Sequence, residues 1–193
     1  MLIAIYLLLI TTATWASIPL DHDKNKVTAQ FINTVSTKHK IPKPWLKKQF
    51  SGLYFNERAI ALIQKPAEGK AWPAYRKLFI TPKRIHQGQT FISQHQNVLR
   101  DYEKKFGIPK EIVVAIMGIE TNYGATQGDF NALEALSTLA FYYVPRHSFF
   151  ESELVALVNY AWRNQLDLHT LTGSYAGALG IMQFMPSNLL LYA

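Results

Sequence analysis

Apolar residues recur at helical spacing, three or four positions apart, along much of the chain. Residues 27–50 predict a long helix followed by a short one, because Pro42 and Pro44 interrupt the pattern between them. Residues 64–90 predict an ordered, loop-rich connection, since prolines and glycines break every period there. Residues 90–106 predict a further helix, with apolar residues at near-helical intervals among polar ones. Helices therefore dominate the predicted elements.

Residues 111–120 form an almost unbroken apolar run that ends in a carboxylate, Glu120. Pro109 suits the first helical position, and Glu111 suits the first turn, where its charge meets the positive end of the helix dipole. These entry signals favour a helix, although the β-branched residues of the run also allow a buried strand. Because apolar residues occupy every face of this helix, we expect other helices to enclose it.

Glu120, at the C-terminal end of this helix, is the first candidate for chemistry. Burial and the negative end of the helix dipole would both favour the protonated carboxyl group. A protonated carboxyl is what a general acid needs to protonate the leaving oxygen in glycosidic bond cleavage. The alternative is an exposed last turn, with Gly124 ending the helix, and the local pattern alone favours it. Asp129 and Asp167 are the candidates for a second carboxylate.

The next segment predicts two more helices. Asn131 and Glu134 resemble a helix N-cap and its reciprocal acid, and Pro145 should end the helix that they begin. Glu151 and Glu153 fall near the start of the following helix, where stabilisation by the helix dipole is the ordinary explanation. That helix carries one apolar stripe, made of Phe150, Leu154, Leu157, Val158 and Ala161.

Residues 173–187 form a glycine-rich stretch, Gly-Ser-Tyr-Ala-Gly-Ala-Leu-Gly-Ile-Met-Gln-Phe-Met-Pro-Ser. Its small residues permit close approach of the backbone to another helix or to a ligand. The stretch lacks the Gly-Lys-Ser/Thr ending of a phosphate-binding loop, so nucleotide binding is rejected. The six histidines show no metal-ligand spacing and the chain has no cysteine, so no metal site is predicted.

The net charge of +7 lies entirely after residue 20, because no charged side chain precedes Asp21. Residues 1–16 combine an apolar core with small residues before Ala16, which predicts a signal peptide; an uncleaved membrane anchor is the alternative. An exported, periplasmic and basic protein suits an acidic polymer or an anionic membrane surface. The lysines of residues 38–48 are more simply a solvated face than a nucleic-acid site, because no motif would place a helix in a groove.

Two motifs together resemble the membrane-bound lytic murein transglycosylase B family. They are Ile-Glu-Thr-Asn-Tyr-Gly at residues 119–124 and the glycine-rich stretch at residues 173–187. The resemblance extends to residues 71–82 and 106–111, so it covers nearly everything after the signal peptide. It implies a mainly α fold with a lysozyme-like core.

The resemblance implies a peptidoglycan lytic transglycosylase, which cleaves the MurNAc-β-1,4-GlcNAc bond without water and leaves 1,6-anhydro-MurNAc. One glutamate acts first as general acid and then as base, and Glu120 occupies its position. Ser174 would orient the 2-acetamido group or the ring-closing hydroxyl, and Gln183 would hydrogen-bond sugar. Each also has a structural explanation, as a turn cap or as the partner of buried backbone. Tyr123 and Phe184 are expected to form walls of the site.

Glycan strands of peptidoglycan are the expected partner, no cofactor is expected, and association with membrane or cell-wall proteins stays open. We expect a helical, loop-rich accessory region at residues 17–100 and the lysozyme-like core at residues 101–193. The family continues past the Met-Pro-Ser motif, so this core is expected to be incomplete. Two alternatives remain: a hydrolytic muramidase, which needs a positioned water and usually a second carboxylate, and an inactive peptidoglycan-binding protein.

Overall fold

The computed structural model describes residues 18–65 and 71–192, and nearly all of its regular structure is helical. The signal peptide predicted at residues 1–16 lies outside these ranges. The α-helices are α1 (Lys26–His39), α2 (Lys43–Gln49), α3 (Glu57–Ile63), α4 (Trp72–Phe79), α5 (Pro82–Gln94), α6 (Gln96–Phe106), α7 (Lys110–Thr121), α8 (Ala132–Tyr142), α9 (His147–Arg163) and α10 (Pro186–Tyr192). Short 3-10 turns lie at η3 (Val144–Arg146) and η4 (Leu168–Thr170). Strands β1 (Phe130–Asn131) and β2 (Thr172–Gly173) pair antiparallel. The predicted mainly α class is confirmed.

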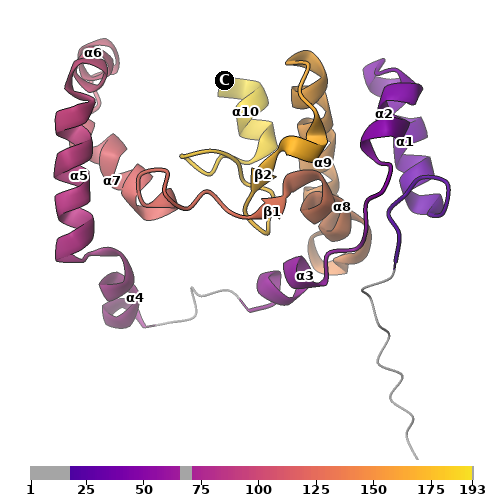
Figure 1. Cartoon of the computed structure of the whole chain (residues 1–193), viewed down its shortest axis with the longest axis horizontal. Coiled ribbons are helices and arrows are strands. Elements are labelled where there is room, and N and C mark those ends of the chain that lie inside the picture. The colour runs from indigo at the N-terminus through magenta and orange to yellow at the C-terminus, as the bar shows by residue number, and fades with distance from the viewer. Residues whose placement is uncertain (1–17, 66–70, 193) are drawn as a thin grey trace, which may run out of the picture.

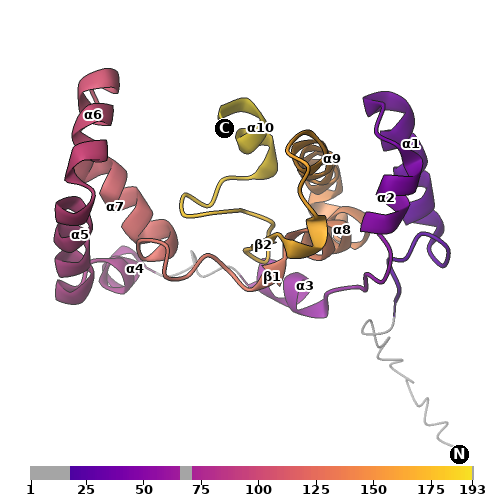
Figure 2. The same ribbon diagram turned by 45° about the horizontal axis from the view of Figure 1, so that its top comes forward.

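The helices fall into two groups that are well separated in both Figure 1 and Figure 2. We call α1, α2, α3, α8, α9 and α10 the helical body, and α4 to α7 the α4–α7 arm. Residues 122–129 lead from the end of α7 into the helical body, and the loop between β2 and α10 reaches from the body back toward the arm (Figure 1). No helix among the described residues combines the length and the apolar character needed to cross a membrane.

The hydrophobic core lies in the helical body, where α8 packs against α9 and the α1–α2 pair covers them. The core side chains of α8 have no exposed surface; they are Leu133, Leu136 and Leu139. The predicted stripe of α9 is confirmed, because all five of its residues, from Phe150 to Ala161, are also fully buried. Burying each leucine-sized side chain contributes roughly 1.5–3 kcal/mol, so this core accounts for much of the stability of the body.

Local signals explain where helices α1 and α2 begin. The Asn25 side-chain oxygen accepts hydrogen bonds from the backbone N–H groups of Val27 (3.0 Å) and Thr28 (3.2 Å). Helix α1 ends where Lys40 adopts a left-handed φ of 58°, and α2 follows with Pro44 in its first turn. Proline fits there because the first helical N–H groups have no intrahelical partner. The prediction of a long helix and a short one divided by proline is confirmed.

The predicted loop-rich connection at residues 64–90 is wrong over most of its described length, because α4 and α5 occupy it. Pro73 lies in the first turn of α4 and Pro82 is the first residue of α5. Thr81 caps α5 by accepting a hydrogen bond from Arg84 N at 3.2 Å. The prolines therefore begin helices instead of breaking them. The helix predicted at residues 90–106 is divided at His95, where the φ of −112° separates α5 from α6.

The α4–α7 arm buries far less apolar surface than the helical body. Leu99 and Val114 are the large apolar side chains that it buries among the described residues. The β-branched residues of α7 stay half exposed: Ile112 at 52%, Ile116 at 43% and Ile119 at 51%. The run at 111–120 is a helix, as predicted, but the expectation that other helices enclose it is wrong for the described structure. Helices α5 and α6 both contact α7 but leave these isoleucines about half exposed.

Candidate active site

Glu120 lies on the last turn of α7, and its side chain is exposed. The chain then reverses direction through three residues with left-handed backbone: Asn122 (φ 51°), Tyr123 (φ 61°) and Gly124 (φ 89°). The expected burial of the carboxyl group is therefore wrong here, and the alternative of an exposed last turn is confirmed. The helix ends at Thr121, and Asn122 is its left-handed cap. Gly124, which the sequence suggested as the end of the helix, lies three residues after Thr121.

Thr121, directly after Glu120, joins the two sequence motifs. Its side chain is fully buried, and its hydroxyl donates a hydrogen bond to the Ile181 carbonyl oxygen at 2.8 Å. Thr121 Oγ1 also accepts a hydrogen bond from Gly124 N at 2.9 Å, which holds the reversal after α7. The end of α7 is thus fixed to the glycine-rich stretch 60 residues further along the chain. Sequence reasoning did not single out Thr121, because this partner is visible only in three dimensions.

The glycine-rich stretch folds into compact turns. Ser174 Oγ accepts hydrogen bonds from the backbone N–H groups of Ala176 (3.3 Å) and Ala178 (3.1 Å). Leu179 and Phe184 exchange backbone hydrogen bonds of 2.8 and 3.0 Å, which closes a tight hairpin between them. The structural explanation of Ser174, a turn cap, therefore holds. A Cβ atom on Gly128 would lie 2.0 Å from the Gly173 carbonyl oxygen, so glycine allows the segment after the first motif to contact the start of the second.

Gln183 connects the glycine-rich stretch to the segment that follows the first motif. Its side-chain amide donates hydrogen bonds to the carbonyl oxygens of Gln127 (3.2 Å) and Gly180 (2.9 Å). The amide nitrogen of Gln183 therefore pairs with backbone carbonyl groups of both segments, which agrees with the structural explanation given for this residue. Its backbone has a left-handed φ of 48°, which aims the side chain back across the hairpin.

The two aromatic candidates have different surroundings. The Tyr123 hydroxyl donates a hydrogen bond to the Arg84 carbonyl oxygen at 2.8 Å, and its ring fills the space left by Gly88 and Gly118 where α5 meets α7. Phe184 lies instead on an apolar cleft of about 460 Å³, together with residues of α6 and α7 such as Met117. Phe184 therefore forms a wall of this cleft, which Glu120 does not line, whereas Tyr123 joins α5 and α7.

Glu153 has a different environment from the one that the sequence suggested. Its side chain is 5% exposed, and its two oxygens accept hydrogen bonds from Ser187 N (2.9 Å) and Ser187 Oγ (2.7 Å). Helix α9 thereby holds the Met-Pro-Ser end of the second motif and the start of α10. Glu151 is half exposed and pairs with His147 Nε2 at 3.3 Å. The sequence did not reveal the contact of Glu153 with Ser187, because stabilisation by the helix dipole already explained a glutamate near the start of this helix.

The two candidates for a second carboxylate are both engaged. Asp129 accepts a hydrogen bond from the Arg58 guanidinium at 2.8 Å, which holds the pKa of Asp129 below its usual range. Asp167 accepts a hydrogen bond from His169 N at 3.0 Å and caps the turn η4. The predicted N-cap is confirmed, because Asn131 accepts a hydrogen bond from Glu134 N at 2.9 Å. The predicted reciprocal role of Glu134 is wrong, because its carboxylate instead accepts hydrogen bonds from Tyr54 N (3.2 Å) and Asn56 Nδ2 (3.4 Å). Glu120 is exposed and directly precedes Thr121, whose hydroxyl bonds to Ile181, whereas the exposed Asp129, next to Gly128, is paired with Arg58.

Comparison with known proteins identifies relatives of this chain. The family model of the transglycosylase SLT domain matches residues 23–193. Membrane-bound lytic murein transglycosylase B of Escherichia coli K12 is 36% identical over 183 residues, which cover 90% of this chain and 51% of that protein. The crystal structure of soluble lytic transglycosylase SltB1 from Pseudomonas aeruginosa aligns with a TM-score of 0.81 and 39% identity, over 86% of this chain and 56% of that one.

SltB3 from Pseudomonas aeruginosa, solved in complex with NAG-NAM-pentapeptide, aligns with a TM-score of 0.77 and 27% identity, over 86% of this chain and 45% of that one. The fold is therefore the lysozyme-like fold of lytic transglycosylases, as the resemblance implied. The chain belongs to the transglycosylase SLT domain family. It spans about half the length of the relatives that it matches.

Proposed function

We propose that this protein is a peptidoglycan lytic transglycosylase in which Glu120 serves as the single general acid and then as the general base. Family membership supports the reaction class. The observation that carries the residue assignment is the hydrogen bond from Thr121 Oγ1 to the Ile181 carbonyl oxygen. It brings an exposed carboxylate next to the second motif, so that one sugar chain can contact both.

In the proposed reaction, the Glu120 carboxyl first protonates the glycosidic oxygen as the bond between that oxygen and C1 of MurNAc breaks. The resulting carboxylate then removes the proton from the 6-hydroxyl of the same sugar, whose oxygen bonds to C1. The products are a free hydroxyl on GlcNAc and a 1,6-anhydro-MurNAc end, and no water is consumed. The 2-acetamido group is proposed to stabilise the positive charge at C1, as in substrate-assisted glycosidases. One carboxylate is sufficient for this sequence of steps.

The other site residues are proposed to act around this carboxylate. Ser174 Oγ accepts two backbone hydrogen bonds, which leaves its own proton for a sugar or acetamido oxygen. Gln183 uses its amide nitrogen on backbone, so we propose that its amide oxygen accepts a hydrogen bond from a sugar hydroxyl. Phe184 is proposed to pack against a sugar face, and Tyr123 to keep the end of α7 in place.

We propose an exported, periplasmic location, with residues 1–16 as the signal peptide. The composition of that segment supports it, as does the relative whose name describes it as membrane-bound. SltB3 was solved with a NAG-NAM-pentapeptide, which supports peptidoglycan glycan strands as the substrate of this chain. Attachment to the membrane through an uncleaved N-terminal segment remains the alternative form of the same proposal.

The Glu120→Gln variant tests the assignment. It keeps the size of the side chain and removes the transferable proton, so turnover should fall by about 10²–10⁴-fold. The matched control is Glu111→Gln, which changes another exposed glutamate of α7, paired with Lys110 at 3.2 Å. Purified protein is incubated with sacculi and the products are analysed by mass spectrometry, with circular dichroism to verify folding.

Each product distinguishes one hypothesis. Anhydro ends from the unmodified chain and from Glu111→Gln, but not from Glu120→Gln, support the proposal. Reducing ends would show a hydrolytic muramidase. Equal turnover by Glu120→Gln would remove Glu120 from the mechanism, and sacculus binding by a folded chain without products would indicate a binding protein.

A further inference from the structure

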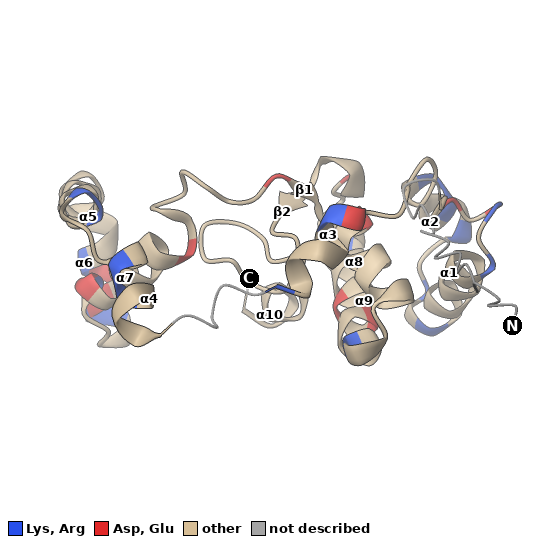
Figure 3. Cartoon of the chain, turned by 90° about the horizontal axis from the view of Figure 1, so that it is seen from below, with Lys and Arg blue, Asp and Glu red and all other residues tan. Residues whose placement is uncertain are grey.

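Lys and Arg positions mark α1, α2 and the segment before them at one end of the molecule, and further ones mark the α4–α7 arm at the other end (Figure 3). Residues 18–50 contain two aspartates, Asp21 and Asp23, and seven lysines, at positions 24, 26, 38, 40, 43, 47 and 48. This end therefore carries a net charge of +5 out of the +7 of the whole chain. Such an end attracts anionic groups over a range set by the ionic strength.

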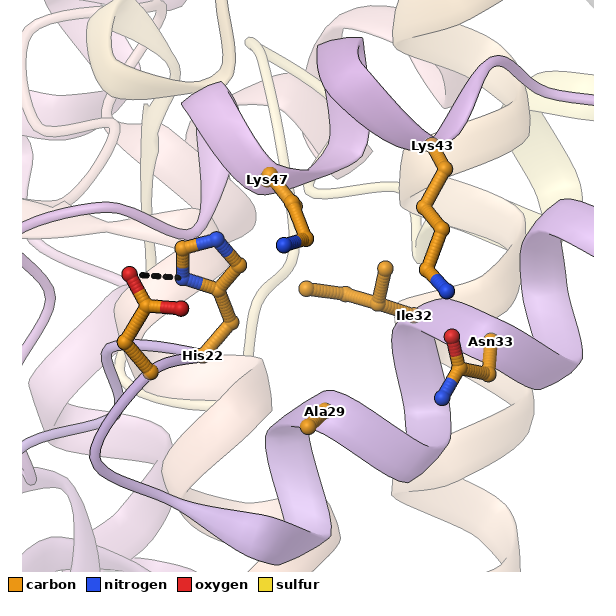
Figure 4. Close-up of a pocket in the computed structure, with 7 residues that line it drawn as sticks. His22, Ala29, Ile32, Asn33, Lys43 and Lys47 are labelled. Atoms are coloured by element: carbon orange, nitrogen blue, oxygen red, sulfur yellow. Dashed lines mark ion pairs between the residues drawn. The ribbon is translucent and has the colours of Figure 1, made fainter.

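A cavity of about 250 Å³ opens between α1 and α2 at this end (Figure 4). Lys43 and Lys47, four residues apart on α2, lie on one side of the opening, and Asn33 of α1 lies opposite Lys43. Ala29 and Ile32 supply an apolar floor. Basic and amide groups that converge over an apolar floor are the usual features of a site for a small anionic ligand.

One carboxylate, that of Asp23, lines this cavity, and Asp21 lies two residues before it in the chain; both face the His22 ring. His22 Nδ1 lies 3.3 Å from Asp21 Oδ1 and 3.7 Å from Asp23 Oδ2. Asp21 also accepts hydrogen bonds from the backbone N–H groups of Asp23 and Gly52, and the first of these contributes most to holding its pKa below the usual value. In residues 18–65 and 71–192, no carboxylate lies within 4.0 Å of the ammonium group of Lys43 or Lys47. Two lysines thus face the cavity without a counter-ion in the described structure.

We propose that this cavity binds a carboxylate of the peptide that peptidoglycan carries on its MurNAc sugars. The two lysines would hold the carboxylate, the Asn33 side-chain amide would donate a hydrogen bond to it, and Ile32 would contact the aliphatic part of the peptide. Helices α1 and α2 lie at the opposite end of the molecule from the α4–α7 arm, so this contact is separate from the one at Glu120 (Figure 1). The inference rests on the proposed function, because it names a second part of the same substrate.

Binding is tested on the full chain with two probes, GlcNAc–MurNAc-pentapeptide and the same compound with its carboxylates amidated. The double variant Lys43→Gln/Lys47→Gln should bind the first probe about tenfold more weakly, since each exposed ion pair contributes about 0.2–1 kcal/mol. The matched control is Lys26→Gln/Lys48→Gln, which removes the same charge from the same two helices but does not line the cavity. Its affinity should change less than about threefold.

Titration calorimetry gives the affinities, and chemical shifts of the Asn33 and His22 amides show the location. Weaker binding of the amidated probe to the unmodified chain, together with the difference between the two double variants, supports the inference. Equal losses in both double variants would show a non-specific electrostatic attraction and overturn it, as would equal affinity for both probes. Binding only to anionic lipid vesicles would also overturn it, in favour of a membrane contact.

These measurements are independent of turnover. If Glu120→Gln abolishes anhydro products while neither double variant changes affinity, the proposed function stands and the peptide site fails. If the chain yields no products but the peptide still binds through Lys43 and Lys47, the reverse holds.

Discussion

The helical body and the α4–α7 arm each contain a strongly apolar helix, α8 in the body and α7 in the arm, yet they bury these helices very differently. Helices α8 and α9 form a core whose leucines have no exposed surface, whereas the isoleucines of α7 remain about half exposed. An exposed isoleucine contributes little to stability, while a fully buried one contributes roughly 1.5–3 kcal/mol. The body therefore has the packing of an independently stable unit, and the arm does not.

The proposed active site lies where these two regions meet. Glu120 belongs to the arm, and Ser174 and Gln183 belong to the loop that extends from the body. The two regions are joined through the bonds from Thr121 to Ile181 and from Gln183 to Gln127, and through the glycine contact between Gly128 and Gly173. The geometry at Glu120 consequently depends on a few polar contacts more than on a shared hydrophobic core.

The largest expected effect compares the two regions directly. Leu154→Ala removes a fully buried side chain from the core of the body and should lower the free energy of unfolding by about 2–5 kcal/mol. Ile116→Ala removes a side chain that is 43% exposed and should cost less than about 1 kcal/mol. Urea denaturation measures both, and amide hydrogen exchange should show the arm opening at lower free energy than α8 and α9. Equal costs for the two variants would contradict the comparison.

A second prediction concerns the connection inside the body. Glu153→Ala should destabilise the protein by about 2–3 kcal/mol, because Ser187 N and Oγ lose a charged acceptor. Glu153→Gln keeps an oxygen acceptor and should cost about 1 kcal/mol or less. Thermal denaturation compares the two. If both variants lose the same stability, the negative charge matters and not the hydrogen bonds, and the proposed role of Glu153 in holding the second motif is wrong.

A smaller effect on stability is expected at the junction itself. Thr121→Val removes the hydroxyl that donates to Ile181 and should cost about 0.5–1.5 kcal/mol. We expect turnover to fall by more than this loss of stability implies. The variant lacks the hydrogen bond that holds the end of α7, and with it Glu120, against the second motif. Thr121→Ser keeps the hydroxyl and should restore most of the turnover. Parallel measurement of product formation and urea denaturation separates the two effects, and a Val variant with full turnover would show that the bond does not position Glu120.

The sequence predicted the helices that local signals define, and missed what depends on tertiary contacts. Helix α7 was recognised from Pro109 and Glu111, and the α9 stripe from its period, because both signals lie within the helix. An apolar pattern shows that a helix favours burial but not that anything covers it, so the expected enclosure of Glu120 was wrong. The sequence interpretation took Pro73 and Pro82 as breaks in regular structure, whereas each lies in the first turn of a helix. Proline can begin a helix as well as end one.

The candidate site divides in the same way. The local pattern singled out Glu120, and the resemblance added Ser174 and Gln183. The contacts of Thr121 and Glu153 connect residues 60 and 34 positions apart, and no local pattern records them. The division into an accessory region at residues 17–100 and a core at residues 101–193 stays a prediction. In the described structure, α1 and α2 from the first range pack against α8 and α9 from the second.

The smallest expected effect concerns the ion pair that connects α3 of the body with the segment leaving the arm. The Arg58 guanidinium holds the pKa of Asp129 below its unfolded value, so the pair stabilises the fold above that unfolded value and loses this contribution as pH falls through the lowered one. Asp129→Asn removes the charge and leaves Arg58 over the Phe130 ring, 4.3 Å from its centre. The variant should therefore be slightly less stable at neutral pH, less so in high salt, and equal to the unmodified chain well below about pH 4. Thermal denaturation across pH 3–7 tests this, and a difference that persists at the acid end would mean that Asp129 acts through its backbone turn and not through its charge.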